Sequence, residues 1–143
     1  MSKTSGNDVF ILSATRSAIG GFGGTLKNTT PIDLGTAIAA AAIQRSGIPA
    51  AQIGHAVIGN VIHSEARDMY VSRCISIGAG MAESAPALTV NRLCGSGLQA
   101  IVSATQLLQL GDAETALAGG VEVMSRGGHL MPSLRWGSRM GDA

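Results

Sequence analysis

Cys94 lies in a segment whose residue types and spacing suit nucleophilic chemistry. It follows a short apolar run at residues 86–90, is followed by Gly95 and Gly97, and precedes a stretch with helical spacing. A thiol at the first turn of a helix lies near unpaired backbone N–H groups and the positive end of the helix dipole, which favour the reactive thiolate. The glycines leave room for a substrate carbonyl to approach the sulfur and these N–H groups. The segment therefore indicates a catalytic nucleophile, with a buried structural cysteine as the alternative.

The other cysteine and two of the histidines have simpler interpretations. Cys74 lies on the apolar side of a predicted helix at residues 71–79, where a thiol serves as a small core side chain. His55 opens a predicted strand, and its ring is expected to satisfy local polar groups. His63 follows that strand and could line the site or a subunit contact, although a solvated loop is the simpler interpretation. No pair of cysteines and histidines has the spacing of metal ligands, so no metal site is predicted.

Strand and helix patterns alternate along the chain in the order βαβαβαβ. Short apolar runs typical of buried strands occur at residues 9–12, 55–62, 86–90 and 115–121. Helical patterns separate these runs. The alternation predicts an α/β fold with a mainly parallel sheet and right-handed crossovers.

The first helix has clear boundaries in the sequence. Thr30 is a suitable N-cap, Pro31 occupies the first helical position, and Asp33 supports the first turn. Gly47 marks the end of the helix. We expect one apolar side, formed by Leu34, Ala37, Ile38, Ala41 and Ala42.

The helix predicted after Cys94, at residues 95–110, is apolar over most of its circumference. Its apolar positions include Leu98, Ala100, Ile101, Val102, Ala104 and Leu107. A helix of this kind is normally buried, and one domain of this size cannot cover it on all sides. We therefore expect the chain alone to expose apolar surface that a partner would cover.

Composition and charge limit the possible functions. The chain has 143 residues, which suits one ordinary domain, and 45% of them are hydrophobic but only 3% aromatic. A formal net charge of +1 gives no electrostatic footprint for nucleic acid or an anionic membrane, and no apolar run reaches transmembrane length. With two cysteines, a disulfide framework is not predicted, so a reducing, cytoplasmic compartment is the default expectation.

Several further segments accompany the Cys94 segment in a distinctive order. They are residues 16–27, 59–62 with 67–69, 118–125 and 135–142. Together with Asn-Arg-Leu-Cys-Gly-Ser-Gly-Leu-Gln-Ala at residues 91–100, they resemble consecutive segments of thiolases, the acyl-CoA C-acetyltransferases and 3-ketoacyl-CoA thiolases. The resemblance runs from about Val9 to the last residue, and the Cys94 segment is its most specific part.

The resemblance implies an acyl-CoA C-acyltransferase with Cys94 as its nucleophile. The expected reaction is thiolysis of a 3-ketoacyl-CoA or Claisen condensation of acyl-CoA units, in which the backbone N–H of Cys94 helps to hold the oxyanion. Coenzyme A thioesters are substrates, and no separate cofactor is expected. The implied domains are a thiolase N-terminal α/β domain at residues 1–122 and the start of a loop domain at residues 123–143. In the family, the helix after the nucleophile is sandwiched between two duplicated halves.

The same resemblance implies catalytic groups that these 143 residues do not contain. They are a second cysteine in a Cys-x-Gly-Gly-Gly segment, a histidine in a Gly-His-Pro segment and an Asn-Glu-Ala-type segment. We therefore expect the sequence to be the first portion of a thiolase. Downstream sequence or a companion chain would complete the site.

Subunit contacts are the other expectation drawn from the resemblance. A dimer is expected around residues 86–90 and the loop at 63–69, where Glu65, Arg67 and Asp68 offer charges of both signs for a self-complementary contact. The basic final stretch could approach the phosphates of coenzyme A or join two dimers into a tetramer, and the resemblance favours the tetramer contact. Its candidate residues are Arg126, His129, Arg135, Trp136 and Arg139.

Two alternatives remain open at this point. The chain could be a non-catalytic thiolase-like module retained for assembly or binding. It could also belong to a ketosynthase-like condensing enzyme, which shares the fold and a nucleophilic cysteine. A companion chain that carries the missing catalytic segments would favour the enzyme, whereas a stable, monodisperse chain without one would favour the module.

Overall fold

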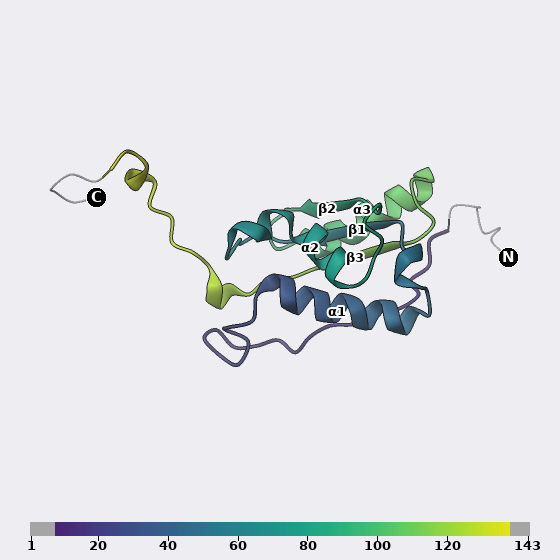
Figure 1. Cartoon of the computed structure of the whole chain (residues 1–143), viewed down its shortest axis with the longest axis horizontal. Helices are drawn as coiled ribbons and strands as arrows, with labels where there is room; N and C mark the ends of the chain where they lie inside the picture. Colours follow the sequence, from purple (N-terminus) through teal and green to yellow (C-terminus); the bar gives the residue numbers. More distant parts are fainter. Residues whose placement is uncertain (1–7, 138–143) are drawn as a thin grey trace.

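A three-stranded parallel sheet forms the centre of the protein (Figure 1). The computed structural model describes residues 8–137, and within them the strand order is β2-β1-β3. β1 pairs in parallel with both of its neighbours, which confirms the predicted α/β fold. The strands are His55–Gly59 (β1), Ala87–Val90 (β2) and Ala116–Gly120 (β3).

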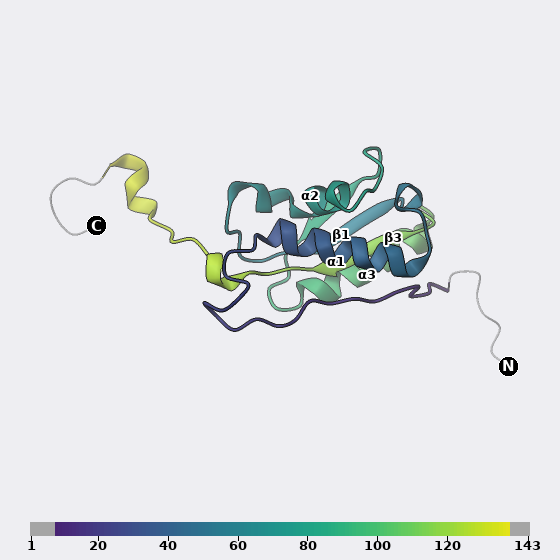
Figure 2. The ribbon, with the colours of Figure 1, turned by 60° about the horizontal axis from the view of Figure 1, so that its bottom comes forward.

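Helices cover both faces of this sheet (Figure 2). The three α-helices are Pro31–Ser46 (α1), Val71–Gly78 (α2) and Ser96–Leu110 (α3). Ile58 of β1 packs with residues of α1 and α2, whereas its neighbour Val57 packs with Ala100 and Ala104 of α3. Successive strand residues point to opposite faces, so α1 and α2 form one layer and α3 forms the other. Short 3-10 helices span Ala50–Gln52 (η1), Ala66–Tyr70 (η2), Met124–Arg126 (η3) and Pro132–Trp136 (η4).

The ends of α1 confirm the signals read from the sequence. The Thr30 side chain accepts a hydrogen bond from the backbone N–H of Asp33 (3.0 Å), and Gly47 adopts a left-handed conformation with φ of 73°. The predicted apolar side is only partly right, because Ala37 is exposed. Two sides of α1 carry apolar residues: Ile32 and Ala39 pack toward α2, while Leu34, Ile38 and Ala42 line a cleft.

The layer of α1 and α2 is tightly packed. Ile75 of α2 is only 1% exposed and lies in a cluster with Ile58 and Val71. The helices approach so closely that a Cβ added to Gly78 would lie 2.9 Å from the side chain of Thr36. Small residues at this crossing therefore allow the larger apolar side chains beside it to be buried.

The strand predicted at residues 9–12 is not formed. This segment runs in an extended conformation alongside α1 (Figures 1 and 2), where Ser13 and Thr15 donate side-chain hydrogen bonds to the carbonyls of Ala42 and Ile38. A cleft of about 1230 Å³, lined by residues 8–17, α1, α3 and β3, separates the segment from the sheet. Without an adjacent strand, its backbone has no ladder partner, and the side chain of Ile11 is left 80% exposed.

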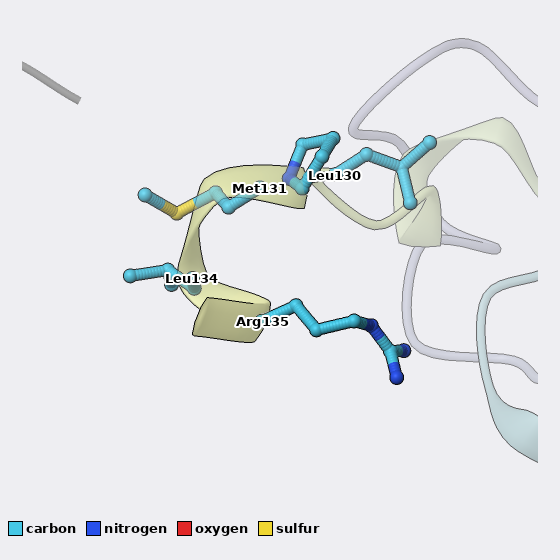
Figure 3. A pocket seen from close by; sticks show the side chains of 5 residues that line it. Leu130, Met131, Leu134 and Arg135 are labelled. Carbon is cyan, nitrogen blue, oxygen red and sulfur yellow. The ribbon is translucent and has the colours of Figure 1, made fainter. Parts of the chain in front are cut away.

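The chain beyond β3 extends away from the sheet (Figure 1). One link ties its first turn to the N-terminal loop, because the backbone N–H of Gly23 donates to Ser125 Oγ (2.8 Å). Further along, one short stretch encloses a hollow of about 490 Å³ (Figure 3), lined by Leu130, Met131, Pro132, Leu134 and Arg135. These side chains are mostly exposed and come from a single turn, so the hollow is not a built binding site. Arg139, also named above, lies outside the described residues.

Candidate functional site

Cys94 lies on a short turn between the carboxyl end of β2 and the start of α3. Cys94 is exposed, and neither it nor Cys74 forms a disulfide. The N-cap of α3 is Gly95, which uses no side chain to cap the helix. The thiol therefore immediately precedes the N-cap, one position earlier than a first-turn placement, but still next to the positive end of the helix.

The residue before the nucleophile has an unusual backbone conformation. Leu93 has φ of 50°, and it is the only non-glycine residue with positive φ within residues 8–137. For a leucine, the left-handed region costs about 1–2 kcal/mol because Cβ crowds the following carbonyl oxygen. Such conformations concentrate at functional sites, where the surrounding structure holds them.

Glycines let the start of α3 rest directly on the ends of two strands. A Cβ added to Gly59 of β1 would lie 2.6 Å from the carbonyl carbon of Ser96, and one added to Gly120 of β3 would lie 3.1 Å from Gly97 Cα. Backbone therefore packs on backbone here. This seat fixes the first turn of α3, and with it Cys94, at the carboxyl edge of the sheet.

Two polar residues that the sequence analysis did not assign hold the same edge together. Asn60 is fully buried and donates from Nδ2 to the carbonyl of Val121 (2.9 Å), which joins the ends of β1 and β3. Glu122 accepts hydrogen bonds from the backbone N–H groups of Val61 and Ile62. Asn60 lies one residue beyond β1 and Glu122 two residues beyond β3. The carboxyl ends of parallel strands share one edge, so these positions could have indicated this role.

The charged side chains of the loop after β1 form hydrogen bonds and an ion pair within this chain, which the sequence analysis did not predict. Asp68 is completely buried, and its Oδ2 accepts from Ser64 N (2.7 Å), Ser64 Oγ (2.8 Å) and Glu65 N (3.1 Å). Glu65 forms an ion pair with Arg126 (3.5 Å). Asp68 is thus a structural group of the loop and is not available for a contact between subunits, which corrects that part of the expectation.

The sequence matches the thiolase N-terminal domain family over residues 9–143. The chain belongs to the thiolase family. It is 52% identical over 136 residues to beta-ketothiolase BktB of Cupriavidus necator, covering 95% of this chain and 34% of that protein. It is 38% identical over 133 residues to the mitochondrial 3-ketoacyl-CoA thiolase of Bos taurus, covering 93% of this chain and 34% of the relative.

Solved thiolase structures share this fold. The human mitochondrial 3-ketoacyl-CoA thiolase in complex with CoA superposes with a TM-score of 0.90 and 35% identity, covering 94% of this chain and 34% of that one. The Bacillus anthracis acetyl-CoA acetyltransferase gives a TM-score of 0.88 and 36% identity, with 93% and 34% covered. The chain thus spans about a third of the length of the relatives it matches.

The remaining candidates of this thiolase domain lie away from Cys94 or have structural partners. His55 is at the amino end of β1, the edge opposite Cys94, and its Nδ1 lies 3.1 Å from the carbonyl of Ala56. Cys74 is half-buried against the α1–α2 core, and its Sγ contacts Arg67 Nη2 (3.9 Å), which raises the pKa of Arg67 above its usual value. His63 and His129 are exposed.

Metal-ligand clusters and membrane-spanning helices are both absent from the described residues. Residues 8–137 contain no group of three or more His, Cys, Asp or Glu side chains that could hold a metal ion. Over the same range, none of the helices has both the length and the apolar character needed to cross a membrane.

Proposed function

We propose that Cys94 is the acyl-carrying nucleophile of a thiolase that acts on acyl-CoA substrates. The observation that carries the proposal is the exposed thiol between a strand end and a helix N-terminus, directly after the strained Leu93. Membership in the thiolase family supports the same assignment. The named relatives are thiolases and acetyl-CoA acetyltransferases, so a ketosynthase-like enzyme is not favoured.

The proposed first step is acyl transfer to sulfur. The Cys94 thiolate attacks the carbonyl carbon of an acyl-CoA, the bond to the coenzyme A sulfur breaks, and the released thiolate takes up a proton. The backbone N–H of Cys94 donates to the negative oxygen that develops during this attack. In the condensing direction, the α-carbanion of a second acyl-CoA then attacks the acyl carbon, which forms a carbon–carbon bond and frees the Cys94 thiolate. Thiolysis of a 3-ketoacyl-CoA is the reverse sequence.

Groups outside this chain complete the proposed reaction. The base that removes the α-proton and the remaining oxyanion donors would come from downstream sequence or from a companion chain. Within residues 8–137, the groups at the strand edge, Asn60 and Glu122, hold backbone and are not proposed as the base.

Labelled acetyl-CoA tests the nucleophile in the assembled protein, that is, this chain together with the remaining part of a thiolase. We expect label on Cys94, and we expect Cys94→Ala to reduce acyl transfer by about 10⁴-fold or more, as removal of a nucleophile does. Cys74→Ala is the matched control, because Cys74 is the other free cysteine and packs against the core. Label on Cys74, or full activity in Cys94→Ala, would refute the proposal.

We also propose that the assembled thiolase is at least a dimer. β2 forms one edge of the sheet and leaves Leu88 44% exposed beside the nucleophile turn, which supports a contact through this strand. Residues 126–139 are proposed to join two dimers into a tetramer. Light scattering on the assembled protein should give at least a dimer mass, and deletion of residues 126–139 should remove any tetramer. A mass of one thiolase unit would refute the dimer.

A cytoplasmic location is proposed on the state of the cysteines. Cys74 and Cys94 are both free, as expected in a reducing compartment. Cell fractionation with an antibody to the native protein would test this, and recovery in an oxidising compartment would contradict it.

A further inference from the structure

The backbone around Leu93 is held by one buried hydroxyl group. Ser96 Oγ donates to the carbonyl of Leu93 (2.7 Å) and accepts from the backbone N–H of Arg92 (2.8 Å). Ser96 itself is only 5% exposed, and its backbone rests on Gly59. The hydroxyl therefore links the peptide before Arg92 and the peptide after Leu93 to the start of α3, whose backbone cannot move closer to the sheet.

Two other hydrogen bonds fix the same turn. Asn91 Oδ1 accepts from the backbone N–H of Leu93 (3.0 Å), and the backbone N–H of Ser96 donates to the Leu93 carbonyl (3.0 Å). The Leu93 carbonyl thus receives both the hydroxyl and the N–H of Ser96. The left-handed conformation of Leu93 is held from its amino side by Asn91 and from its carboxyl side by Ser96.

The direction of the Leu93 carbonyl determines the direction of the Cys94 N–H. The described residues contain no cis peptide bond, and in a trans peptide the C=O and the following N–H point in opposite directions. Because the carbonyl points toward Ser96 at the start of α3, the Cys94 N–H points away from the helix. An N–H that is already oriented before substrate arrives costs no reorganisation during the reaction.

We propose that Ser96 is a positioning residue of this site: its buried hydroxyl holds Leu93 in the left-handed conformation and so aims the backbone N–H of Cys94 at the acyl oxygen. Asn91 assists from the exposed side of the turn. The inference rests on the proposed role of Cys94 and adds the group that orients it.

The test compares two reactions of Cys94 in the assembled protein. Acylation by labelled acetyl-CoA depends on the N–H that holds the oxyanion, whereas alkylation by iodoacetamide forms no oxyanion. We expect Ser96→Ala to reduce the second-order rate constant of acylation by about 30-fold or more, within the range for a misdirected oxyanion donor. The alkylation rate constant should change by less than about threefold, because the thiol itself remains.

Ser76→Ala is the matched control. Ser76 is also buried and also donates its hydroxyl to a carbonyl three residues earlier, that of Arg73 (3.0 Å), but it belongs to α2 on the other face of the sheet. We expect its ratio of acylation to alkylation to equal that of the wild type. An unfolded chain would lose acylation but would still be alkylated, so both rate constants are measured at Cys94 and expressed per folded molecule, which separates positioning from stability.

Two further variants test the conformational part of the inference. Leu93→Gly removes the steric cost of the left-handed region, so in the Ser96→Ala background it should restore acylation at least threefold. Asn91→Ala alters an exposed residue and should lower the acylation-to-alkylation ratio about three- to tenfold without affecting folding. An unchanged ratio in both Ser96→Ala and Asn91→Ala would overturn the inference, and so would further loss on adding Leu93→Gly. Failure of the wild type to be acylated at Cys94 would instead refute the proposed function.

Discussion

The two faces of the sheet are packed in opposite ways. On the face of α1 and α2, large side chains such as Val71 and Ile75 are almost completely buried. On the other face, the buried residues of α3 are all small (Ser96, Ala100 and Ala104), and the outward Leu98 is 69% exposed. The α1–α2 face therefore has a well-packed apolar core. On the other face, α3 lies close to the sheet, and the side of α3 that points away from the sheet is exposed.

This difference separates stability from positioning. The α1–α2 layer removes much apolar surface from water, so its side chains should determine the free energy of unfolding. Contacts between α3 and the sheet rely on glycine and alanine, which bury little area but permit backbone to approach backbone. Substitutions in the α1–α2 layer should therefore lower the free energy of unfolding, whereas substitutions between α3 and the sheet should displace the nucleophile.

The largest expected effect on acylation follows from adding a side chain at Gly59, where the start of α3 packs on β1. A Cβ at Gly59 would lie 2.6 Å from the Ser96 carbonyl carbon, and backbone cannot yield as a side chain can. We expect Gly59→Ala to displace the start of α3 and to lower acylation of the folded, assembled protein about 100-fold, the cost of roughly 1 Å of misplacement. Mass spectrometry of labelled Cys94 would measure this rate.

Gly78→Ala is the control on the opposite face. Its Cβ would meet the Thr36 side chain at 2.9 Å, which can adjust, and Gly78 is in α2 rather than at the site. Acylation should stay within about twofold of the wild type, because the seat of α3 is unchanged. If both glycine variants reacted alike, the distinction between the two faces would be wrong.

The second prediction concerns stability. Ile75 is 1% exposed in the α1–α2 core, so Ile75→Ala should lower the free energy of unfolding of the assembled protein by about 2–5 kcal/mol. Ile75→Val keeps most of the side chain and should lower it by about 0.5–1.5 kcal/mol. Denaturant titration would measure both, and acylation per folded molecule should be unchanged. A slower acylation rate in Ile75→Val would show that this face also positions the nucleophile.

The sequence predicted most elements because their signals are local. Thr30, Pro31 and Gly47 act through bonds within a few residues, and each was found at the expected end of α1. The helices after residues 70 and 95 also begin within one residue of their predicted starts. Helix ends of this kind depend little on residues far away in the sequence, so residue types and spacing are enough to place them.

Features that depend on distant partners were not predictable in the same way. The apolar run at residues 9–12 has a strand pattern, but pairing needs a neighbouring strand, and here a cleft lies beside it. The sequence does not show that Asp68 is buried, because the backbone N–H groups of Ser64 and Glu65 reach its carboxylate only after the loop folds. The left-handed Leu93 was missed because leucine gives no local signal for that conformation.

The third prediction tests whether the uncovered face needs a partner. The outer side of α3 and residues 9–12 expose large apolar side chains, including Leu98 and Ile11. The chain alone should therefore bind a hydrophobic dye and aggregate, and supplying the remaining part of a thiolase should reduce dye fluorescence severalfold. Leu98→Gln should weaken dye binding by the chain alone, whereas Ile75→Val should not. A monomer that binds no dye would favour an independent module.

The smallest effect is expected at the start of α1, which is built differently from the start of α3. Thr30 Oγ1 caps α1 by accepting from Asp33 N and also donates to Asp33 Oδ2 (2.7 Å), whereas the Gly95 N-cap of α3 has no capping side chain. Thr30→Ala should lower the free energy of unfolding of the assembled protein by about 1 kcal/mol, and Thr30→Ser, which keeps the hydroxyl, should retain most of it. Neither variant should alter acylation, because α1 is capped for stability while the start of α3 is left open beside the nucleophile. Equal destabilisation by the two substitutions would show that the hydroxyl does not cap α1, and altered acylation would show that α1 contributes to the site.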